Sequence, residues 1–178
     1  MSDDAGQRLL VLATALGQAL LRQHLVLTTA ESCTAGGIAY AVTLIPGSSE
    51  WFDRGFITYT NEAKMQMLGV APAYLRDFGA VSEPVARAMA QGALSHSTAQ
   101  VSVAVTGIAG PSGETPTKRV GTVCLAWALR RDPTLAAWVK TDTRHFEGDR
   151  AAVRTQSIVC AIETLIDLLN SRQDAQVT

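Results

Sequence analysis

Three segments of polar and small residues carry the side chains best suited to chemistry. They are residues 31–34, 59–64 and 106–113, and each directly follows a predicted strand. In folds that alternate strands with helices, ligands bind beyond the carboxyl ends of the strands, where loops lead into helix N-termini. We therefore expect the three segments to converge on one active site.

Ser32 is the first candidate nucleophile. It is predicted at the exit from a strand, and the small residues after it would let backbone N–H groups approach a substrate oxygen closely. The N-terminus of the helix that follows would also stabilise a developing oxyanion. Capping is the commoner role for a serine before a helix, and sequence context alone does not separate these two roles.

Lys64 is the best candidate for the base that a serine nucleophile needs, since no histidine lies in the three segments. If Asn61 caps a helix, Lys64 lies in the first turn, where the helix dipole disfavours an ammonium and lowers its pKa. Tyr59 could hold the lysine amine or relay its proton. The plainer alternative is an exposed lysine beside a half-buried tyrosine.

Other residues in these segments offer weaker candidates. Cys33 is a rival nucleophile, because a helix N-terminus can lower a thiol pKa. Glu31 and Glu62 could form a carboxylate pair, although glutamates near helix starts more often act as electrostatic caps. Arg150, at the start of the last predicted helix, is a candidate phosphate anchor. The backbone donors of residues 106–113 suit a phosphate or a planar ring.

Hydrophobic periodicity and turn residues predict the elements that position these groups. Helices are expected at 8–22, from about 36 to 44, at 61–68, at 83–95 with Ser82 as cap, and from 148–150 to about 170. Strands are expected at 25–29, 56–60, 101–105, 120–129 and 136–146, the last two as an antiparallel pair around residues 132–133. This alternation predicts a layered α/β fold with a mixed sheet.

The composition narrows the class of protein. With 178 residues, of which 47% are hydrophobic and 17% charged, we expect one domain over residues 1–178, with a frayed polar tail at 171–178. Near balance between 15 basic and 16 acidic residues disfavours nucleic acid as a partner. No apolar stretch is long enough to cross a membrane, so a cytoplasmic location is expected. Scattered cysteines and histidines predict neither a disulfide framework nor a metal site.

Seven blocks, taken in order, resemble the CinA C-terminal domain family, whose active members are nicotinamide-nucleotide amidases. The blocks are residues 29–34, 46–49, 59–64, 79–83, 106–111, 120–123 and 148–150. The resemblance implies a three-layer α/β/α sandwich with a mixed, mostly parallel sheet, assembled as a homodimer or higher homo-oligomer. It also implies hydrolysis of nicotinamide mononucleotide to nicotinate mononucleotide and ammonia, in pyridine nucleotide recycling, without metal or organic cofactor.

Carried over by position, the resemblance implies that Ser32 is the nucleophile, Lys64 the general base and Tyr59 a polar residue beside them. The implied substrate-binding residues are Cys33, Thr34 and Gly36 in the turn around the nucleophile, Thr106, Gly107, Ala109, Gly110 and Arg150 around the nucleotide, and Ser48 from its own loop.

Some positions depart from the family pattern. Ala35 stands where the family often has glycine, a mild change if the backbone there keeps a negative φ. Ser112, Glu114 and Arg119 replace an acidic residue, a glycine and a proline, and Glu114 would repel a phosphate unless it pairs with Lys118 or Arg119. These changes leave two alternatives: a non-catalytic nucleotide-binding or regulatory paralogue, and an amidase for another pyridine or nucleoside carboxamide.

Overall fold

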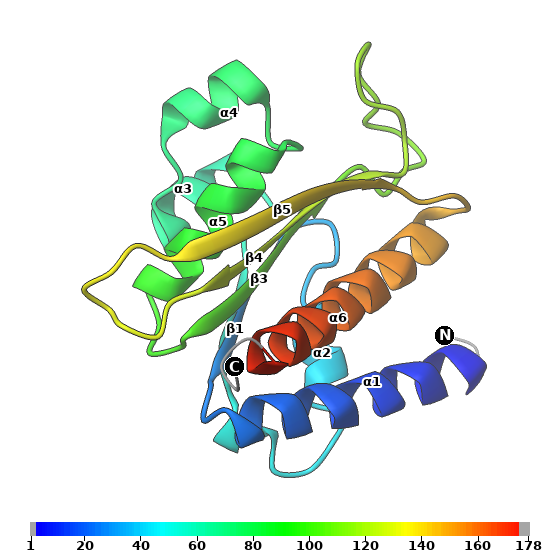
Figure 1. The fold of residues 1–178 in the computed structure, drawn as a ribbon. Coiled ribbons are helices and arrows are strands. Elements are labelled where there is room, and N and C mark those ends of the chain that lie inside the picture. The colour runs from blue at the N-terminus through cyan, green and yellow to red at the C-terminus, as the bar shows by residue number, and fades with distance from the viewer. Residues whose placement is uncertain (1–2, 175–178) are drawn as a thin grey trace.

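The computed structural model describes residues 3–174 (Figure 1). In chain order the elements are α1 (Asp3–Arg22), β1 (Leu27–Glu31), α2 (Gly37–Val42), the 3-10 helix η1 (Ser48–Glu50), β2 (Phe52–Ile57), α3 (Asn61–Leu68), α4 (Pro72–Phe78), α5 (Glu83–Ser95), β3 (Val101–Gly107), β4 (Thr122–Leu129), β5 (Trp138–His145) and α6 (Arg150–Asp174). The expected tail is helical as far as Asp174, and its remaining residues lie outside the described part.

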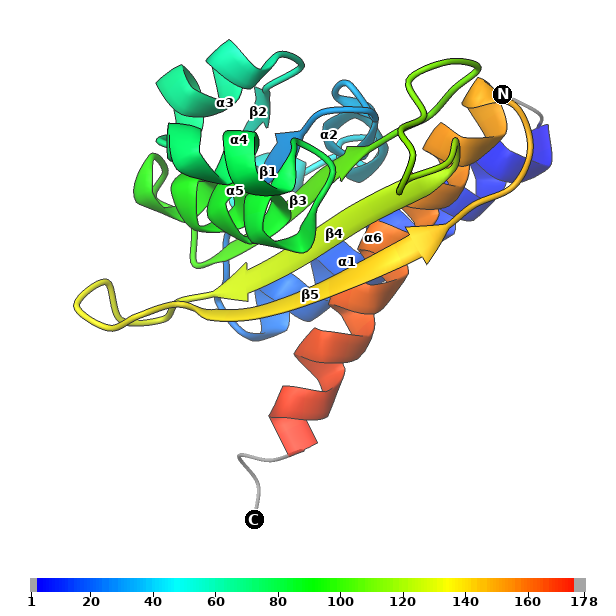
Figure 2. The same ribbon diagram turned by 90° about the horizontal axis from the view of Figure 1, so that it is seen from above.

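The five strands form one open sheet in the order β2-β1-β3-β4-β5 (Figure 2). β1 pairs in parallel with both β2 and β3, whereas β3–β4 and β4–β5 are antiparallel. Only β4 is therefore reversed, and the other four strands share one direction. This confirms the mixed, mostly parallel sheet that the resemblance implies.

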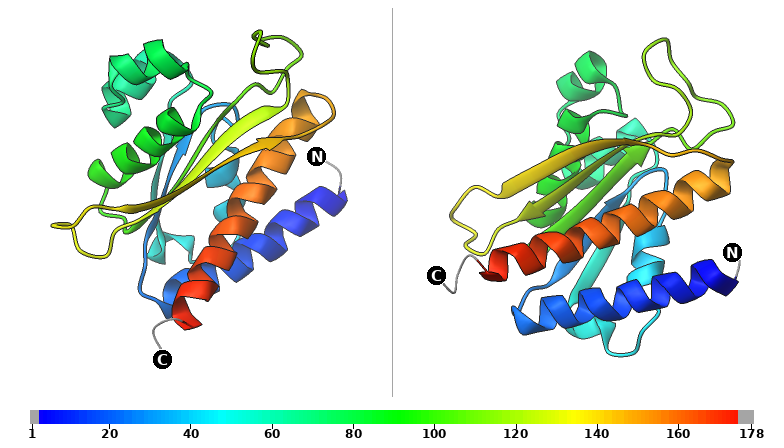
Figure 3. Two further views of the ribbon diagram at one scale, coloured as in Figure 1. Left: turned by 45° about the horizontal axis from the view of Figure 1, so that its top comes forward. Right: turned by 45° about the vertical axis from the view of Figure 1, so that its right-hand side comes forward.

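Helices cover both faces of the sheet, which makes three layers (Figure 3). α1, α2 and α6 lie on one face, and α3, α4 and α5 lie on the other. Side chains alternate along a strand, so Val103 and Val105 of β3 belong to the core under α1 and α6, whereas Ala104 belongs to the core under α5. Each face therefore has its own hydrophobic core.

The core under α5 is built from small residues, which lets this helix lie close to its neighbours. Ala86, Ala90 and Ala93 of α5 pack with Ala104 and Ala126 of the sheet. A Cβ on Gly92 would lie 2.1 Å from the carbonyl oxygen of Leu68, so only glycine allows α3 and α5 to approach this closely. α3 carries Lys64, and this packing therefore helps to fix the candidate base.

Most predicted elements are confirmed, with corrected bounds. The first strand lies two residues later than predicted, at 27–31, and the second lies earlier, at 52–57 rather than 56–60. β2 is an edge strand that carries the charged residues Asp53 and Arg54 next to each other, which masks the strand pattern. α4 was not predicted, because seven residues are too few to show a clear helical period.

The three parallel strands bring the predicted loops to one edge of the sheet. The ladder continues past the strand ends, since the N–H of Ser32 donates to the Val105 carbonyl (2.9 Å) and that of Thr58 to the Glu31 carbonyl (2.8 Å). This extended register sets Thr58 beside Ser32, so the expected convergence at the carboxyl edge is confirmed.

No helix within residues 3–174 is both long and apolar enough for a transmembrane span.

Candidate active site

A cavity of about 220 Å³ lies at this carboxyl edge. It is lined by Ser32, Cys33, Tyr59, Asn61, Lys64, Ala80, Val81, Thr106, Gly107, Ala109 and Arg150. The lining comes from the loops after β1, β2 and β3, the end of β3, the first turn of α3, the connection between α4 and α5, and the first residue of α6. Eight of the twelve predicted site residues line this one cavity. Asn61, Ala80 and Val81 were missed as lining residues.

Ser32 and Lys64 are in direct contact inside the cavity. Lys64 Nζ donates to Ser32 Oγ at 3.1 Å and to the carbonyl oxygen of Thr58 at 2.8 Å. Lys64 is only 1% exposed and Ser32 8%. The alternative of an exposed lysine is therefore wrong, and so is the alternative of Ser32 as helix cap, because Gly36 occupies the N-cap of α2.

Burial sets the protonation of Lys64. Loss of hydration disfavours its ammonium form and lowers its pKa from 10.5 to about 8, while the neighbouring Cys33 acts in the opposite direction. Thr60, rather than Asn61, caps α3 by accepting from the N–H of Ala63 (3.1 Å). Lys64 nevertheless lies in the first turn, as predicted. A neutral amine is thus accessible within a unit or so of neutral pH.

Tyr59 lines the cavity, but its hydroxyl makes no hydrogen bond to the Lys64 amine, so the predicted role of holding that amine is not supported. Its hydroxyl accepts a hydrogen bond from Arg150 Nη2 at 2.8 Å, and the residue is 54% exposed. Arg150 also donates through Nη1 to the Gly110 carbonyl at 2.9 Å. Tyr59 and Arg150 therefore form a polar pair at the cavity, apart from the buried Ser32–Lys64 contact.

Cys33 is a poor nucleophile although it borders the cavity. Burial raises the pKa of its thiol to about 11, and the nearby Glu31 charge acts in the same direction. A thiol with this pKa is almost fully protonated at neutral pH. Ser32 is therefore the stronger candidate of the two adjacent residues.

Glu31 is a buried cap on α2 rather than half of a carboxylate pair. Its side chain, on a residue only 1% exposed, accepts from the N–H groups of Ile38 (3.0 Å) and Ala39 (2.9 Å) and from the hydroxyl of Thr34 (2.7 Å). Glu62 is exposed on α3. The N-terminus of α2 is thus occupied by Glu31 and is not free to hold an oxyanion, contrary to the prediction.

Backbone donors remain available in the turn that follows Ser32. Within the described residues, the N–H groups of Cys33 and Thr34 donate to no other residue. Ala35 has φ +51° and Gly36 has φ +87°, so two consecutive residues are left-handed. The condition that Ala35 keeps a negative φ is not met, and the alanine carries backbone strain that glycine would avoid.

Four predicted binding residues lie outside the cavity lining. The Thr34 side chain bonds the buried Glu31, and Gly36 caps α2. The Gly110 carbonyl accepts a hydrogen bond from Arg150. Ser48 begins η1, just before β2, and therefore lies at the opposite, amino edge of the sheet within one chain. A contribution of Ser48 from within the same chain is not supported.

Two residues that sequence reasoning did not single out have unusual hydrogen bonding. Among the side chains that the structure describes, the buried polar atoms without a hydrogen-bond partner are Thr58 Oγ1 and Arg154 Nε. The carbonyl of Thr58 holds Lys64, and Arg154 Nη2 donates to the carbonyl of Thr34 at 2.8 Å. Thr58 therefore contacts the candidate base, and Arg154 contacts the turn that follows Ser32. The i, i+4 spacing of Arg150 and Arg154 was the available signal for the second.

The three departing residues of the loop after Pro111 do not line this cavity. Residues 111–119 form the yellow-green loop at the top right of Figure 1, and neither Ser112, Glu114 nor Arg119 lines the cavity. Lys118 does not pair with Glu114, since its Nζ donates to the carbonyl of Phe78 at 2.9 Å. The altered loop instead borders a separate groove with Arg144 and His145.

Within residues 3–174, no group of three or more His, Cys, Asp or Glu side chains is arranged to hold a metal ion.

Comparison with known sequences gives consistent matches over most of the chain. Residues 10–169 match the CinA C-terminal domain family. Proteins named nicotinamide-nucleotide amidohydrolase PncC, from Pseudomonas putida and from Escherichia coli K12, are each 48% identical over 157 residues. These matches cover 88% of this chain and 94% and 92% of the relatives. A longer CinA-like protein from Akkermansia muciniphila is 47% identical, and the match covers 36% of its length.

Solved structures give the same result. The competence/damage inducible protein CihA from Agrobacterium tumefaciens has a TM-score of 0.83 and 44% identity, with 92% of this chain and 96% of that chain covered. A CinA superfamily protein from Escherichia coli has a TM-score of 0.85 and 36% identity, with 94% and 93% covered. With its fold, its cavity and its sequence matches all in agreement, the chain belongs to the CinA C-terminal domain family.

Proposed function

We propose that the protein is a nicotinamide-nucleotide amidase that hydrolyses the carboxamide of nicotinamide mononucleotide to nicotinate mononucleotide and ammonia. The observation that carries the proposal is the 3.1 Å contact between Lys64 Nζ and Ser32 Oγ at the cavity. The names of the relatives from Pseudomonas putida and Escherichia coli support the same activity. Recycling of pyridine nucleotides is the corresponding metabolic role.

In the first half of the proposed reaction, Ser32 is acylated. The neutral amine of Lys64 accepts the Ser32 proton, and Oγ attacks the carboxamide carbon. The carbonyl oxygen gains the charge and is stabilised by the unoccupied N–H group of Cys33, which lines the cavity. The Lys64 ammonium then protonates the departing nitrogen, so that ammonia leaves and Lys64 is neutral again.

In the second half, water cleaves the ester. Lys64 accepts a proton from water, hydroxide adds to the acyl carbon, and the same backbone N–H group stabilises the second oxyanion. The ester bond to Oγ breaks, and the proton returns from Lys64 to Ser32. The products are one carboxylate and one ammonia for each amide and water consumed, without a metal or organic cofactor in any step.

The remaining lining residues would hold the nucleotide. Arg150 presents a guanidinium at the N-terminal end of α6 and suits a phosphate, although Asp149 occupies part of that helix end by accepting from the N–H of Ala152 (2.8 Å). Tyr59 offers an exposed ring and hydroxyl for the base or ribose. Thr106, Gly107 and Ala109 present little bulk, which leaves room for a planar ring close to the backbone.

The position of the altered loop favours the amidase over a non-catalytic paralogue. Neither Ser112, Glu114 nor Arg119, the departing residues of this loop, lines the cavity. We further propose that the chain acts as one domain, that it forms a homodimer or higher homo-oligomer, and that it works in the cytoplasm. Light scattering coupled to size-exclusion chromatography tests the oligomeric state directly.

The test is to incubate the purified protein with nicotinamide mononucleotide and measure ammonia and nicotinate mononucleotide together. We expect equal amounts of both products from the wild type, and a loss of about 10³-fold or more in Ser32→Ala and Lys64→Ala with unchanged circular dichroism. Nicotinamide riboside and nicotinamide, assayed in parallel, test whether the phosphate is required. A wild type that binds the nucleotide but releases neither product would support the non-catalytic paralogue.

A further inference from the structure

Two arginines on one face of α6 hold the three loops of the active site together. Arg150 and Arg154 are four residues apart, so they project from the same side of the helix. Arg150 binds the Tyr59 hydroxyl after β2 and the Gly110 carbonyl after β3. Arg154 binds the Thr34 carbonyl after β1. The first residues of α6 thus connect all three loops.

The turn that Arg154 contacts depends on outside support for its shape. Ala35 and Gly36 both have positive φ, and the alanine pays a conformational cost to remain there. Such strained backbone persists only where its surroundings determine it strongly. Thr34 is held from both ends, its hydroxyl by Glu31 Oε2 (2.7 Å) and its carbonyl by Arg154 Nη2 (2.8 Å).

Arg154 also carries a buried group that lowers the stability of the fold. Its Nε is buried and has no hydrogen-bond partner, although a buried polar group without a partner costs free energy. Stability alone does not explain such a group. Arg154 does not line the cavity, so contact with the substrate does not explain the unpartnered Nε either.

We propose that Arg154 is a positioning residue for the nucleophile turn. By holding the Thr34 carbonyl, it orients the preceding peptide units so that Ser32 Oγ meets Lys64 and the N–H group of Cys33 faces the oxyanion. This inference rests on the proposed role of Ser32. Arg150 belongs to the nucleotide site, whereas Arg154 acts on the reaction only through the turn.

Arg154→Met tests the proposal by keeping the length and packing of the side chain while removing the hydrogen bond. We expect kcat for nicotinamide mononucleotide to fall about 30- to 100-fold while KM changes less than about threefold, since small misplacements of reacting groups have effects of this size. Arg154→Lys keeps one donor for the Thr34 carbonyl and should recover part of the loss. Arg8→Met is the matched control, because Arg8 pairs with Glu163 of the same helix far from the cavity and is exposed.

A second readout separates this inference from the proposed function. A small fluorophosphonate phosphonylates an activated serine and needs no natural substrate, so the rate of Ser32 modification can be followed by mass spectrometry. We expect Arg154→Met to slow this reaction by a similar factor, with Arg154→Lys intermediate and Arg8→Met unchanged. If nicotinamide mononucleotide is not a substrate but this pattern holds, the inference survives and the proposed substrate fails.

Three results would overturn the inference. The first is a phosphonylation rate of Arg154→Met equal to that of the wild type. The second is a loss that appears only in KM, which would make Arg154 a substrate-binding residue. The third is a loss that disappears when the assay is run well below the melting temperature of the variant, which would make its role one of stability alone.

Discussion

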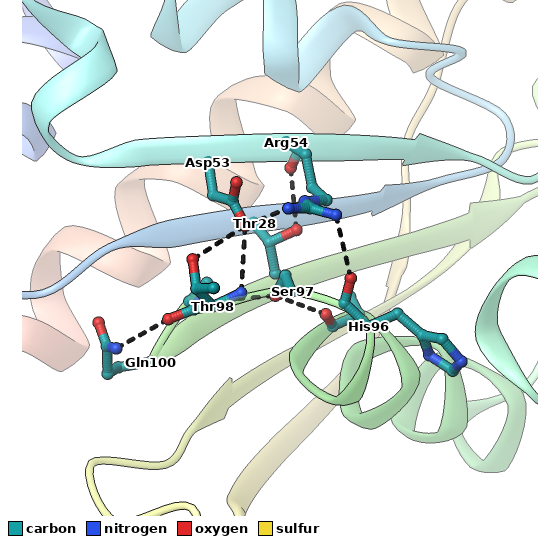
Figure 4. Close-up of polar contacts among 9 residues, drawn as sticks. Thr28, Asp53, Arg54, His96, Ser97, Thr98 and Gln100 are labelled. Atoms are coloured by element: carbon teal, nitrogen blue, oxygen red, sulfur yellow. Dashed lines mark hydrogen bonds and ion pairs between the residues drawn. The ribbon is translucent and has the colours of Figure 1, made fainter.

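The two edges of the sheet differ in how completely their polar groups are satisfied. At the amino edge, Asp53 accepts from Arg54 Nε (3.0 Å) and from the N–H of Thr98 (3.2 Å), and Arg54 also reaches the His96 carbonyl (3.4 Å) (Figure 4). This network ties the edge strand β2 to the loop before β3. At the carboxyl edge, Lys64 is buried, Thr58 Oγ1 has no partner and Ala35 is left-handed.

The difference indicates a division of labour between stability and chemistry. The polar groups of the amino-edge network are paired, although His24 before β1 is left-handed as Ala35 is (φ +53°). The carboxyl edge adds a buried lysine and an unpartnered hydroxyl within a few residues. Departures of this kind concentrate at functional sites, where strain and unusual protonation are part of the mechanism. Changes at the carboxyl edge should therefore alter activity more than stability, and changes at the amino edge should do the reverse.

The largest expected effect is that of Lys64→Met, which removes the proposed base while filling its buried space. Activity toward nicotinamide mononucleotide should fall by about 10³-fold or more, because Ser32 then has no proton acceptor. Lys140→Met is the control, since Lys140 is an exposed lysine on β5 and should keep full activity. Steady-state kinetics measure both. A Lys64→Met enzyme with a tenth of the wild-type rate would exclude the proposed base.

The pH dependence of the wild type sharpens this prediction. With the pKa of Lys64 lowered to about 8, the neutral amine is the minor form at pH 6 and the major form above pH 8. We expect kcat/KM to rise about tenfold per pH unit below this pKa and to level off above it. A flat profile between pH 6 and 8 would contradict the assignment.

The same pKa has a consequence for stability. Because the folded pKa lies below the ordinary value of 10.5, the unfolded chain binds more protons than the folded protein between about pH 8 and 10.5. The contribution of Lys64 to the free energy of unfolding should therefore rise with pH across this window. Lys64→Met should lack that rise, which urea denaturation at several pH values measures.

The next effect in size is that of Glu31→Gln, which we expect to change both stability and activity. A glutamine would turn its NH₂ group toward one of the donors that Glu31 accepts from, so we expect a loss of about 2–3 kcal/mol in the free energy of unfolding. Activity should also fall, since the turn carrying Ser32 loses its inner support. Glu62→Gln is the control, because Glu62 is exposed and, among the described residues, its side chain accepts from Gln66 alone (2.7 Å). Equal free energies of unfolding for the two variants would show that Glu31 does not support the turn that carries Ser32.

Much of the fold and the centre of the site could be predicted from sequence, because both depend on local signals. The strand–loop–helix alternation placed Ser32, Lys64 and Thr106 at one edge, and the structure brings them to one cavity. The capping serine of α5, Ser82, was also predictable from its position before Glu83 and Pro84. Each of these inferences needs only residues within one turn or strand.

The rest depends on which face a side chain takes and on what lies opposite it. The burial of Glu31 under α2 follows from the pleat of β1, so its neighbour Ser32 points to the other face. The contact between Arg154 and Thr34 joins residues 120 positions apart, and no local pattern encodes it. The hydroxyl of Tyr59 bonds Arg150 instead of Lys64 for the same reason.

A smaller effect is expected from Asp53→Asn at the amino edge. Burial acts against ionisation, but hydrogen bonds from Arg54 and Thr98 hold the pKa of Asp53 below its ordinary value. Loss of the charge should lower the free energy of unfolding by about 0.5–1 kcal/mol at pH 7 and leave kcat unchanged. Since the folded pKa is depressed, this difference should shrink as pH falls below about 4. A fall in kcat would break the proposed separation between the two edges.

The smallest effect is expected from Ala35→Gly, which relieves strain at the carboxyl edge. The left-handed conformation costs alanine about 1 kcal/mol relative to glycine, whereas the greater freedom of glycine in the unfolded chain offsets about 0.4–1 kcal/mol of that gain. We therefore expect a change in unfolding free energy between zero and about 0.5 kcal/mol in favour of the variant. Ala15→Gly, at a helical and partly exposed position of α1, is the matched control and should lose about 1 kcal/mol. If the two substitutions destabilise the protein equally, Ala35 carries no strain in solution, and the contrast between the edges then rests on Lys64, Thr58 and Arg154 alone.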